Sequence, residues 1–128
     1  MNAEHTAIVL FAHGSRDPLW AKPIEGLAQR FRELSPQTPV ACAYLELMSP
    51  DLPAAVHDLL SQNPSLQTVK ILPVFFGMGR HAREDLPQLC SDMKHEHPAI
   101  QFECIPAVGE HPEVLDAIAR SALHQLHR

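Results

Sequence analysis

Two histidines occupy matching positions in two similar stretches of the chain. His13 ends the apolar run that begins at Ala7, and His81 follows the apolar run 71–76 after a short stretch with two glycines. A neutral imidazole in a cleft can bind a divalent transition metal while leaving metal positions open, and it can accept a proton near neutral pH. Either histidine alone could instead be a helix cap or a hydrogen-bonded loop residue. Because their placement matches, we predict that both act as metal ligands and proton acceptors.

A carboxylate stands at a third position of the same kind. Glu46 follows the apolar run Ala41–Leu45. There it could act as a base, bind a metal ion or orient an imidazole, and the alternative is an ordinary exposed strand end. We predict that Glu46 assists the two histidines.

Basic and small polar residues surround the histidines. Arg16 lies shortly after the first histidine, whereas Arg80 and Arg83 flank the second. Guanidinium groups bind carboxylates and phosphates, so these arginines predict a rim for an anionic ligand. Ser15 is not part of a GxSxG motif, which favours a turn or cap hydrogen bond over a nucleophilic role. We count Ser15 among the candidate ligand contacts.

The segment before the second histidine combines glycine with large apolar side chains. Gly77-Met78-Gly79 lacks the lysine of a P-loop and the third glycine of a dinucleotide-binding motif, which disfavours nucleotide binding. Phe76 and Met78 could belong to the core or form an apolar floor for a flat ligand. We assign Trp20 and Phe75 to the core.

The elements that must position these residues alternate along the chain. Apolar runs rich in β-branched residues predict strands buried on both faces of a parallel sheet, and amphipathic stretches between them predict helices. The predicted strands are Thr6–Ala12, Val40–Leu45, Thr68–Phe76 and Ile100–Ile105. The predicted helices run from near Pro23 to about Leu34, from a cap at Ser49 or Asp51 to Asn63, from His81–Glu84 through Met93, and from Pro112 to Leu126.

This alternation predicts the α/β class. We expect one domain over residues 1–128, with a four-stranded parallel sheet flanked by helices on both faces. In open sheets of this kind, ligands bind beyond the carboxyl ends of the strands. His13, Glu46 and His81 all fall at or just past those ends, so the sequence predicts one site there.

Composition narrows the class of partner and the compartment. The chain has 128 residues, 45% of them hydrophobic, and a net charge of −5, which disfavours a nucleic-acid or anionic-membrane surface. No apolar run reaches membrane-spanning length, and the N-terminus lacks the form of a signal peptide. Cys42, Cys90 and Cys104 are odd in number and fit no CxxC spacing, so we expect reduced core thiols in a cytoplasmic protein.

Three motifs together resemble a known family. They are Phe11-Ala-His-Gly-Ser-Arg-Asp-Pro18, Tyr44-Leu-Glu-Leu-Met48 and Pro73-Val-Phe-Phe-Gly-Met-Gly-Arg-His-Ala-Arg-Glu-Asp-Leu-Pro87. In this order they resemble the small, single-domain sirohydrochlorin chelatases of the class II tetrapyrrole chelatases, over nearly the whole chain. The resemblance implies a homodimer that inserts Co²⁺, or else Fe²⁺ or Ni²⁺, into sirohydrochlorin for cobalamin or siroheme biosynthesis. It implies no organic cofactor.

The resemblance also implies roles for individual residues. The two active-site histidines of the family match His13 and His81 by motif, and its strand-end glutamate matches Glu46. Arg80 departs from the glycine that many relatives have before the second histidine. An enzyme is our first hypothesis. The alternatives are a metal or tetrapyrrole carrier that binds without inserting, and a paralogue with a changed substrate.

Overall fold

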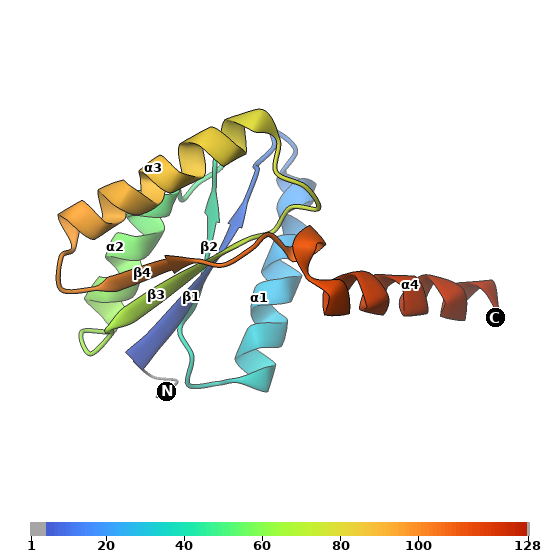
Figure 1. Ribbon diagram of the computed structural model, residues 1–128. Coiled ribbons are helices and arrows are strands. Elements are labelled where there is room, and N and C mark those ends of the chain that lie inside the picture. Colours follow the sequence, from blue (N-terminus) through green and yellow to red (C-terminus); the bar gives the residue numbers. More distant parts are fainter. Residues whose placement is uncertain (1–4, 128) are drawn as a thin grey trace.

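The computed structural model describes residues 5–127 and has a parallel four-stranded sheet at its centre (Figure 1). The strand order is β2-β1-β3-β4, and every pair is parallel. The strands are β1 (Thr6–Ala12), β2 (Val40–Tyr44), β3 (Thr68–Pro73) and β4 (Gln101–Cys104). The predicted α/β class and parallel sheet are therefore confirmed, although β3 ends at Pro73 instead of Phe76.

Helices follow each strand as predicted. The helical segments are η2 (Pro18–Ala21), α1 (Lys22–Leu34), α2 (Leu52–Gln62), α3 (Arg80–Glu96), η3 (Val108–Glu110) and α4 (Pro112–Leu126). Pro23 lies in the first turn of α1. Proline is favourable there because backbone N–H groups of the first turn have no partner within the helix, so its missing N–H costs nothing. Of the two predicted caps of α2, Asp51 is the one used, since its side chain accepts a hydrogen bond from Ala54 N at 3.0 Å. No helix within residues 5–127 has the length and apolar character needed to cross a membrane.

The central strand β1 is buried on both faces, which explains its continuous apolar run. Val9 and Phe11 face a core cluster that α2 and α3 complete. Leu10 and Ala12 face the opposite cluster, which α1 covers. In Figure 1 α1 accordingly lies on one side of the sheet, and α2 and α3 lie on the other.

The last helix does not pack on this sheet. In Figure 1 α4 extends from the end of η3 away from the rest of the chain. None of its described residues is buried, and Leu115, Ile118 and Leu126 are 47%, 44% and 76% exposed. The helix predicted from Pro112 therefore forms, but its apolar stripe has no cover within the described chain.

The expectation that Trp20 belongs to the core is wrong. Its side chain is 37% exposed. It lies in the short helix η2, ahead of the regular turns of α1, so its ring meets Tyr44 edge-on at 6.4 Å instead of entering the core. Phe75, in contrast, packs against the core as predicted.

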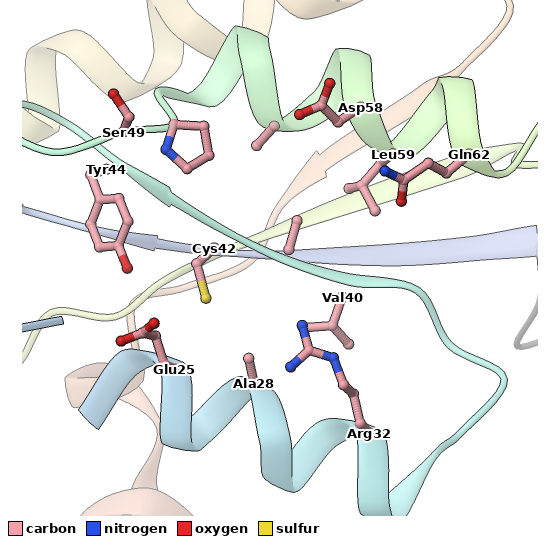
Figure 2. Close-up of a pocket in the computed structure, with 13 residues that line it drawn as sticks. Glu25, Ala28, Arg32, Val40, Cys42, Tyr44, Ser49, Asp58, Leu59 and Gln62 are labelled. Atoms are coloured by element: carbon pink, nitrogen blue, oxygen red, sulfur yellow. The ribbon is translucent and has the colours of Figure 1, made fainter. Parts of the chain in front are cut away.

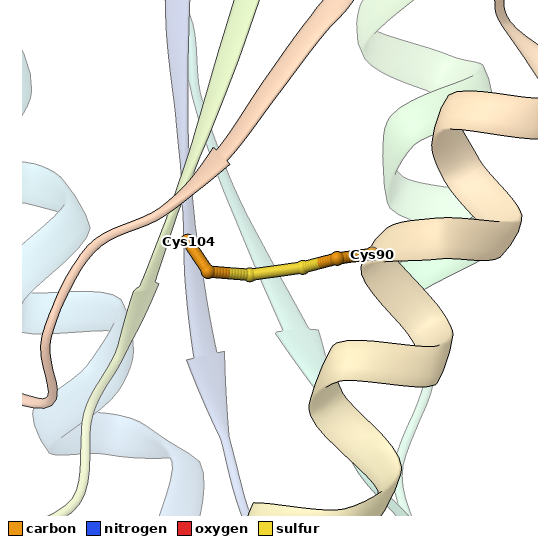
Figure 3. Close-up of a disulfide and its surroundings, with 2 residues drawn as sticks. All are labelled: Cys90 and Cys104. Atoms are coloured by element: carbon orange, nitrogen blue, oxygen red, sulfur yellow. A yellow bond between two sulfur atoms is a disulfide. The ribbon is translucent and has the colours of Figure 1, made fainter.

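The expectation of reduced cysteines is wrong for two of the three. Cys90 of α3 and Cys104 at the end of β4 form a disulfide (Figure 3). Cys90 faces inward from α3, and Cys104 lies on the sheet face that α3 covers, so packing of the helix brings the two sulfurs together. Cys42 is the free cysteine of the described chain.

Thiol titration checks this pairing. The unfolded, unreduced protein is expected to react at Cys42 alone, and prior reduction is expected to release Cys90 and Cys104. Reduction should also lower the free energy of unfolding by about 3 kcal/mol, the chain-entropy value for a closed loop with this sequence separation of 14. A Cys90→Ser/Cys104→Ser variant is the control, because its urea unfolding should not respond to reductant. Three reactive thiols in untreated protein would contradict the disulfide.

Candidate functional site

Parallel pairing brings the ends of β1 and β2 together. Ala12 and Tyr44 are register partners, and the pairing continues one step past both strands. Leu45 N donates to Ala12 O at 2.9 Å, and Glu46 N donates to His13 O at 3.1 Å. Backbone hydrogen bonds thus place the two predicted site residues side by side at the carboxyl edge of the sheet.

The side chains of His13 and Glu46 meet as well. His13 Nε2 lies 3.1 Å from Glu46 Oε1, and the side chains are 54% and 55% exposed. An ionised carboxylate is an acceptor only, so a neutral imidazole in this contact must donate from Nε2. The other ring nitrogen, Nδ1, then keeps its lone pair. Glu46 therefore fixes the tautomer that leaves His13 able to accept a proton or to bind a metal ion through Nδ1.

Gly14 permits the close approach of the two loops. Its φ is +100°, in the region that favours glycine, and a Cβ on it would lie 1.8 Å from Glu46 O. Any larger residue would therefore push apart the backbone segments that carry the pair.

An aromatic ring completes the surroundings of His13. Phe75 lies just past the end of β3, and its ring centroid is 6.4 Å from that of His13 at an interplanar angle of 72°. The sequence analysis assigned Phe75 to the core and did not predict this contact. The signal available in the sequence was that an aromatic residue lies at the end of a buried apolar run.

His81 lies in the first turn of α3. Its side chain is exposed and makes no hydrogen bond or ion pair within residues 5–127. In that range no three His, Cys, Asp or Glu side chains gather closely enough to hold a metal ion. The structure thus assembles His13 with Glu46 and leaves His81 outside that pair, on the helix that follows β3.

The other candidate residues take separate roles. Arg80 Nε pairs with Glu84 Oε1 at 3.3 Å, while Arg16 and Arg83 are exposed and have no ion-pair partner in the described chain.

Ser15 Oγ accepts from Asp17 N at 3.1 Å, which is a turn hydrogen bond of the predicted kind. Phe76 is 69% exposed, whereas Met78 is partly buried against the core. Because its side chain is exposed, Phe76 suits a ligand floor better than Met78 does.

Comparison with known proteins decides the family. The sequence model of the CbiX family matches residues 7–125. The chain belongs to the CbiX family. The chelatase resemblance stated from the motifs is thereby confirmed.

A solved structure shares the fold of this CbiX chain, and longer curated relatives match it in sequence. A crystal structure of a putative cobalamin biosynthesis CbiX protein from Marinobacter aquaeolei VT8 is 29% identical, with a TM-score of 0.81 over 96% of this chain and 98% of that one. The sirohydrochlorin cobaltochelatase of Methanocaldococcus jannaschii is 31% identical over 71% of this chain and 62% of its own length. The chloroplastic sirohydrochlorin ferrochelatase of Arabidopsis thaliana is 28% identical over 93% and 52%. The chain thus matches little more than half of the length of these curated relatives.

A separate pocket of this CbiX chain lies over β2, between α1 and α2 (Figure 2). Its volume is about 410 Å³, and neither histidine of the candidate site lines it. Cys42 and Tyr44 point into it from the strand. Burial raises the pKa of the Cys42 thiol, an effect that Arg32 partly offsets, and burial also raises the pKa of Tyr44. Burial thus favours the neutral forms of Cys42 and Tyr44, and this pocket is distinct from the His13–Glu46 pair.

Substitution at Gly14 tests the loop contact. Gly14→Ala should lower the free energy of unfolding by about 1–3 kcal/mol, because the new Cβ overlaps Glu46 O and the backbone is strained for alanine. Urea unfolding measures this. Gly26→Ala is the matched control: Gly26 lies in α1 with open space around a Cβ, so alanine should stabilise by about 0.5–1 kcal/mol. Equal stability of Gly14→Ala and the unsubstituted protein would show that the two loops are not in this contact.

Proposed function

We propose that this chain inserts a divalent metal ion into sirohydrochlorin, with Co²⁺ as the foremost metal and Fe²⁺ or Ni²⁺ as further candidates. The observation that carries the proposal is the His13–Glu46 pair at the carboxyl edge of a CbiX sheet, 3.1 Å apart and open to ligand. Relatives named sirohydrochlorin cobaltochelatase and sirohydrochlorin ferrochelatase support the choice of substrate and of metals. No organic cofactor is part of the proposed reaction.

Metal insertion requires a proton acceptor. It also requires protein ligands that bind the metal ion and then release it to the macrocycle. Two pyrrole N–H protons leave the macrocycle as the metal ion enters. His13 can accept one proton at Nδ1, because Glu46 takes its Nε2–H and stabilises the resulting imidazolium. His81, in the first turn of α3, supplies a second imidazole that can accept the other proton. Imidazole and carboxylate ligands with open metal positions permit transfer of the ion, since they do not enclose it as a thiolate site would.

The rim residues suit a flat, anionic macrocycle. Arg16 and Arg83 offer guanidinium groups without ion-pair partners in residues 5–127, so they are free to bind the carboxylates of the substrate. Phe76 offers an exposed aromatic face to the ring. In this proposal Ser15, Met78 and Arg80 are secondary contacts, since all three have other partners within the chain.

We further propose that the working form is a homodimer. In fold, the chain covers 48% of the sirohydrochlorin chelatase SirB from Bacillus subtilis, with a TM-score of 0.74 and 21% identity, so two copies would have about the length of one such chain. The apolar stripe of α4 supplies a surface that a second copy can cover. A second copy would also bring further side chains to a site in which His81 stands outside the His13–Glu46 pair.

A carrier function is the second candidate. A protein that binds metal or tetrapyrrole without inserting the ion would use the same imidazoles and arginines. The open, half-exposed His13–Glu46 pair favours release over storage, because stable storage sites enclose their ion more completely.

An absorbance time course with sirohydrochlorin and each of Co²⁺, Fe²⁺ and Ni²⁺ tests the proposal. Catalytic amounts of protein should accelerate insertion over the uncatalysed rate. His81→Ala and Glu46→Gln should each lower kcat at least about 100-fold, the scale of a lost acid–base group. His95→Ala is the control on the same helix, since His95 is exposed near the far end of α3. A stoichiometric spectral shift without turnover would favour the carrier instead.

Sedimentation tests the dimer. The protein should remain dimeric at about micromolar concentration, as an obligate interface would. Leu115→Glu/Ile118→Glu should yield monomers, because it places charges on the apolar stripe of α4. Ala117→Glu is the control, since residue 117 lies on the opposite face of that helix. A fully active monomer would contradict the dimer proposal.

A further inference from the structure

Loops from three strands meet around the His13 imidazole. The loop after β1 carries His13 and the loop after β2 carries Glu46, and their side chains lie 3.1 Å apart. The segment after β3 carries Phe75, whose ring reaches the same imidazole. We propose that Phe75 is a positioning residue that holds His13 against Glu46, and that Gly109 holds Phe75 in place. The proposal rests on the proposed role of His13 in metal insertion.

Phe75 connects the imidazole to the rigid core. Its ring meets Phe11 at 6.2 Å with an interplanar angle of 76°, and Phe11 is only 1% exposed. The same ring meets that of His13 at a centroid distance of 6.4 Å and an interplanar angle of 72°. Both contacts have the edge-to-face geometry that aromatic rings prefer. The half-exposed imidazole is thereby linked through Phe75 to the buried side chain of Phe11.

The hydrogen bond to Glu46 alone would not fix the ring. It holds only Nε2, so the imidazole could pivot about that contact and turn Nδ1 in different directions. Contact with the Phe75 ring restricts the pivot. Phe75 therefore determines where the free lone pair of Nδ1 points, which is the property that proton transfer or metal binding needs.

The backbone of Phe75 is held from two sides. Its preceding residue, Val74, donates from N to Phe11 O at 2.8 Å, which extends the pairing of β3 with β1. Its own carbonyl accepts from Gly109 N at 3.0 Å. A Cβ at residue 109 would lie 1.8 Å from Phe76 O and 2.4 Å from Phe76 Cα. Only glycine lets the η3 turn come this close, so Gly109 sets the position of the segment that carries Phe75.

The imidazole C–H signals of His13 in NMR spectra of the full chain report on its surroundings without any need for turnover. Phe75→Met should shift these signals, because the ring current of Phe75 is lost. Glu46→Gln should shift them in the unsubstituted protein and shift them less in the Phe75→Met background, since the ring is no longer held against residue 46. In the insertion assay Phe75→Met should lower kcat about 10- to 100-fold with little change in KM.

Three further variants separate positioning from general damage. Phe75→Tyr keeps the ring and should restore the His13 signals and kcat. Phe31→Met is the matched control, because Phe31 is also partly buried but packs on the opposite core cluster. Gly109→Ala should shift the His13 signals although it leaves Phe75 itself unchanged. This variant tests the positioning role if Phe75→Met does not fold.

Two results decide the matter. Unchanged His13 signals in Phe75→Met, with a full response to Glu46→Gln, would overturn the positioning role. Shifted signals in a protein that shows no turnover with any metal would keep the positioning role and reject the proposed chelatase activity.

Discussion

Parallel pairing of β1 with its two neighbours is the constraint on which the site depends. Because β1 lies between β2 and β3, all three strands end at one edge, and the loops that follow them must share a small space. Backbone hydrogen bonds continue past the strand ends, from Glu46 to His13 and from Val74 to Phe11. Main-chain geometry thus brings the residues that carry the imidazole, the carboxylate and the aromatic ring to one edge of the sheet, where their side chains interact.

The sequence predicted this arrangement where its signals are local. Continuous apolar runs identified the buried strands, and the residues directly after them, His13 and Glu46, were predicted as site members and lie in contact. Proline marked the start of α1 because it lacks an N–H that the first turn does not need. Asp51 marked the start of α2 because its side chain caps a free backbone N–H. The strands and helix starts were predictable because each depends on a few neighbouring residues. The contact of His13 with Glu46 also follows from parallel pairing, which brings the ends of neighbouring strands to the same edge.

Features that depend on distant packing escaped prediction. An apolar stripe shows which face of a helix avoids water, but it does not show what covers that face. The sequence therefore could not predict that α4 leaves its apolar stripe unpacked against the sheet. Trp20 and Phe75 are both large and apolar, and only their surroundings make one of them exposed and the other a neighbour of His13. The pairing of Cys90 with Cys104 likewise required the placement of α3 over β4. The place of His81 relative to the pair also depends on how α3 leaves its loop.

Gly14 and Gly109 both allow a close approach between two main-chain segments at this edge of the sheet. Each places a Cα directly against the carbonyl of a neighbouring loop, so contact between main chains replaces contact between side chains. The absence of a Cβ thus lets the neighbouring loops approach each other closely at both points. Side chains at the rim, such as those of Arg16, Arg80 and Phe76, can therefore be exchanged without moving the main chain that carries His13 and Glu46.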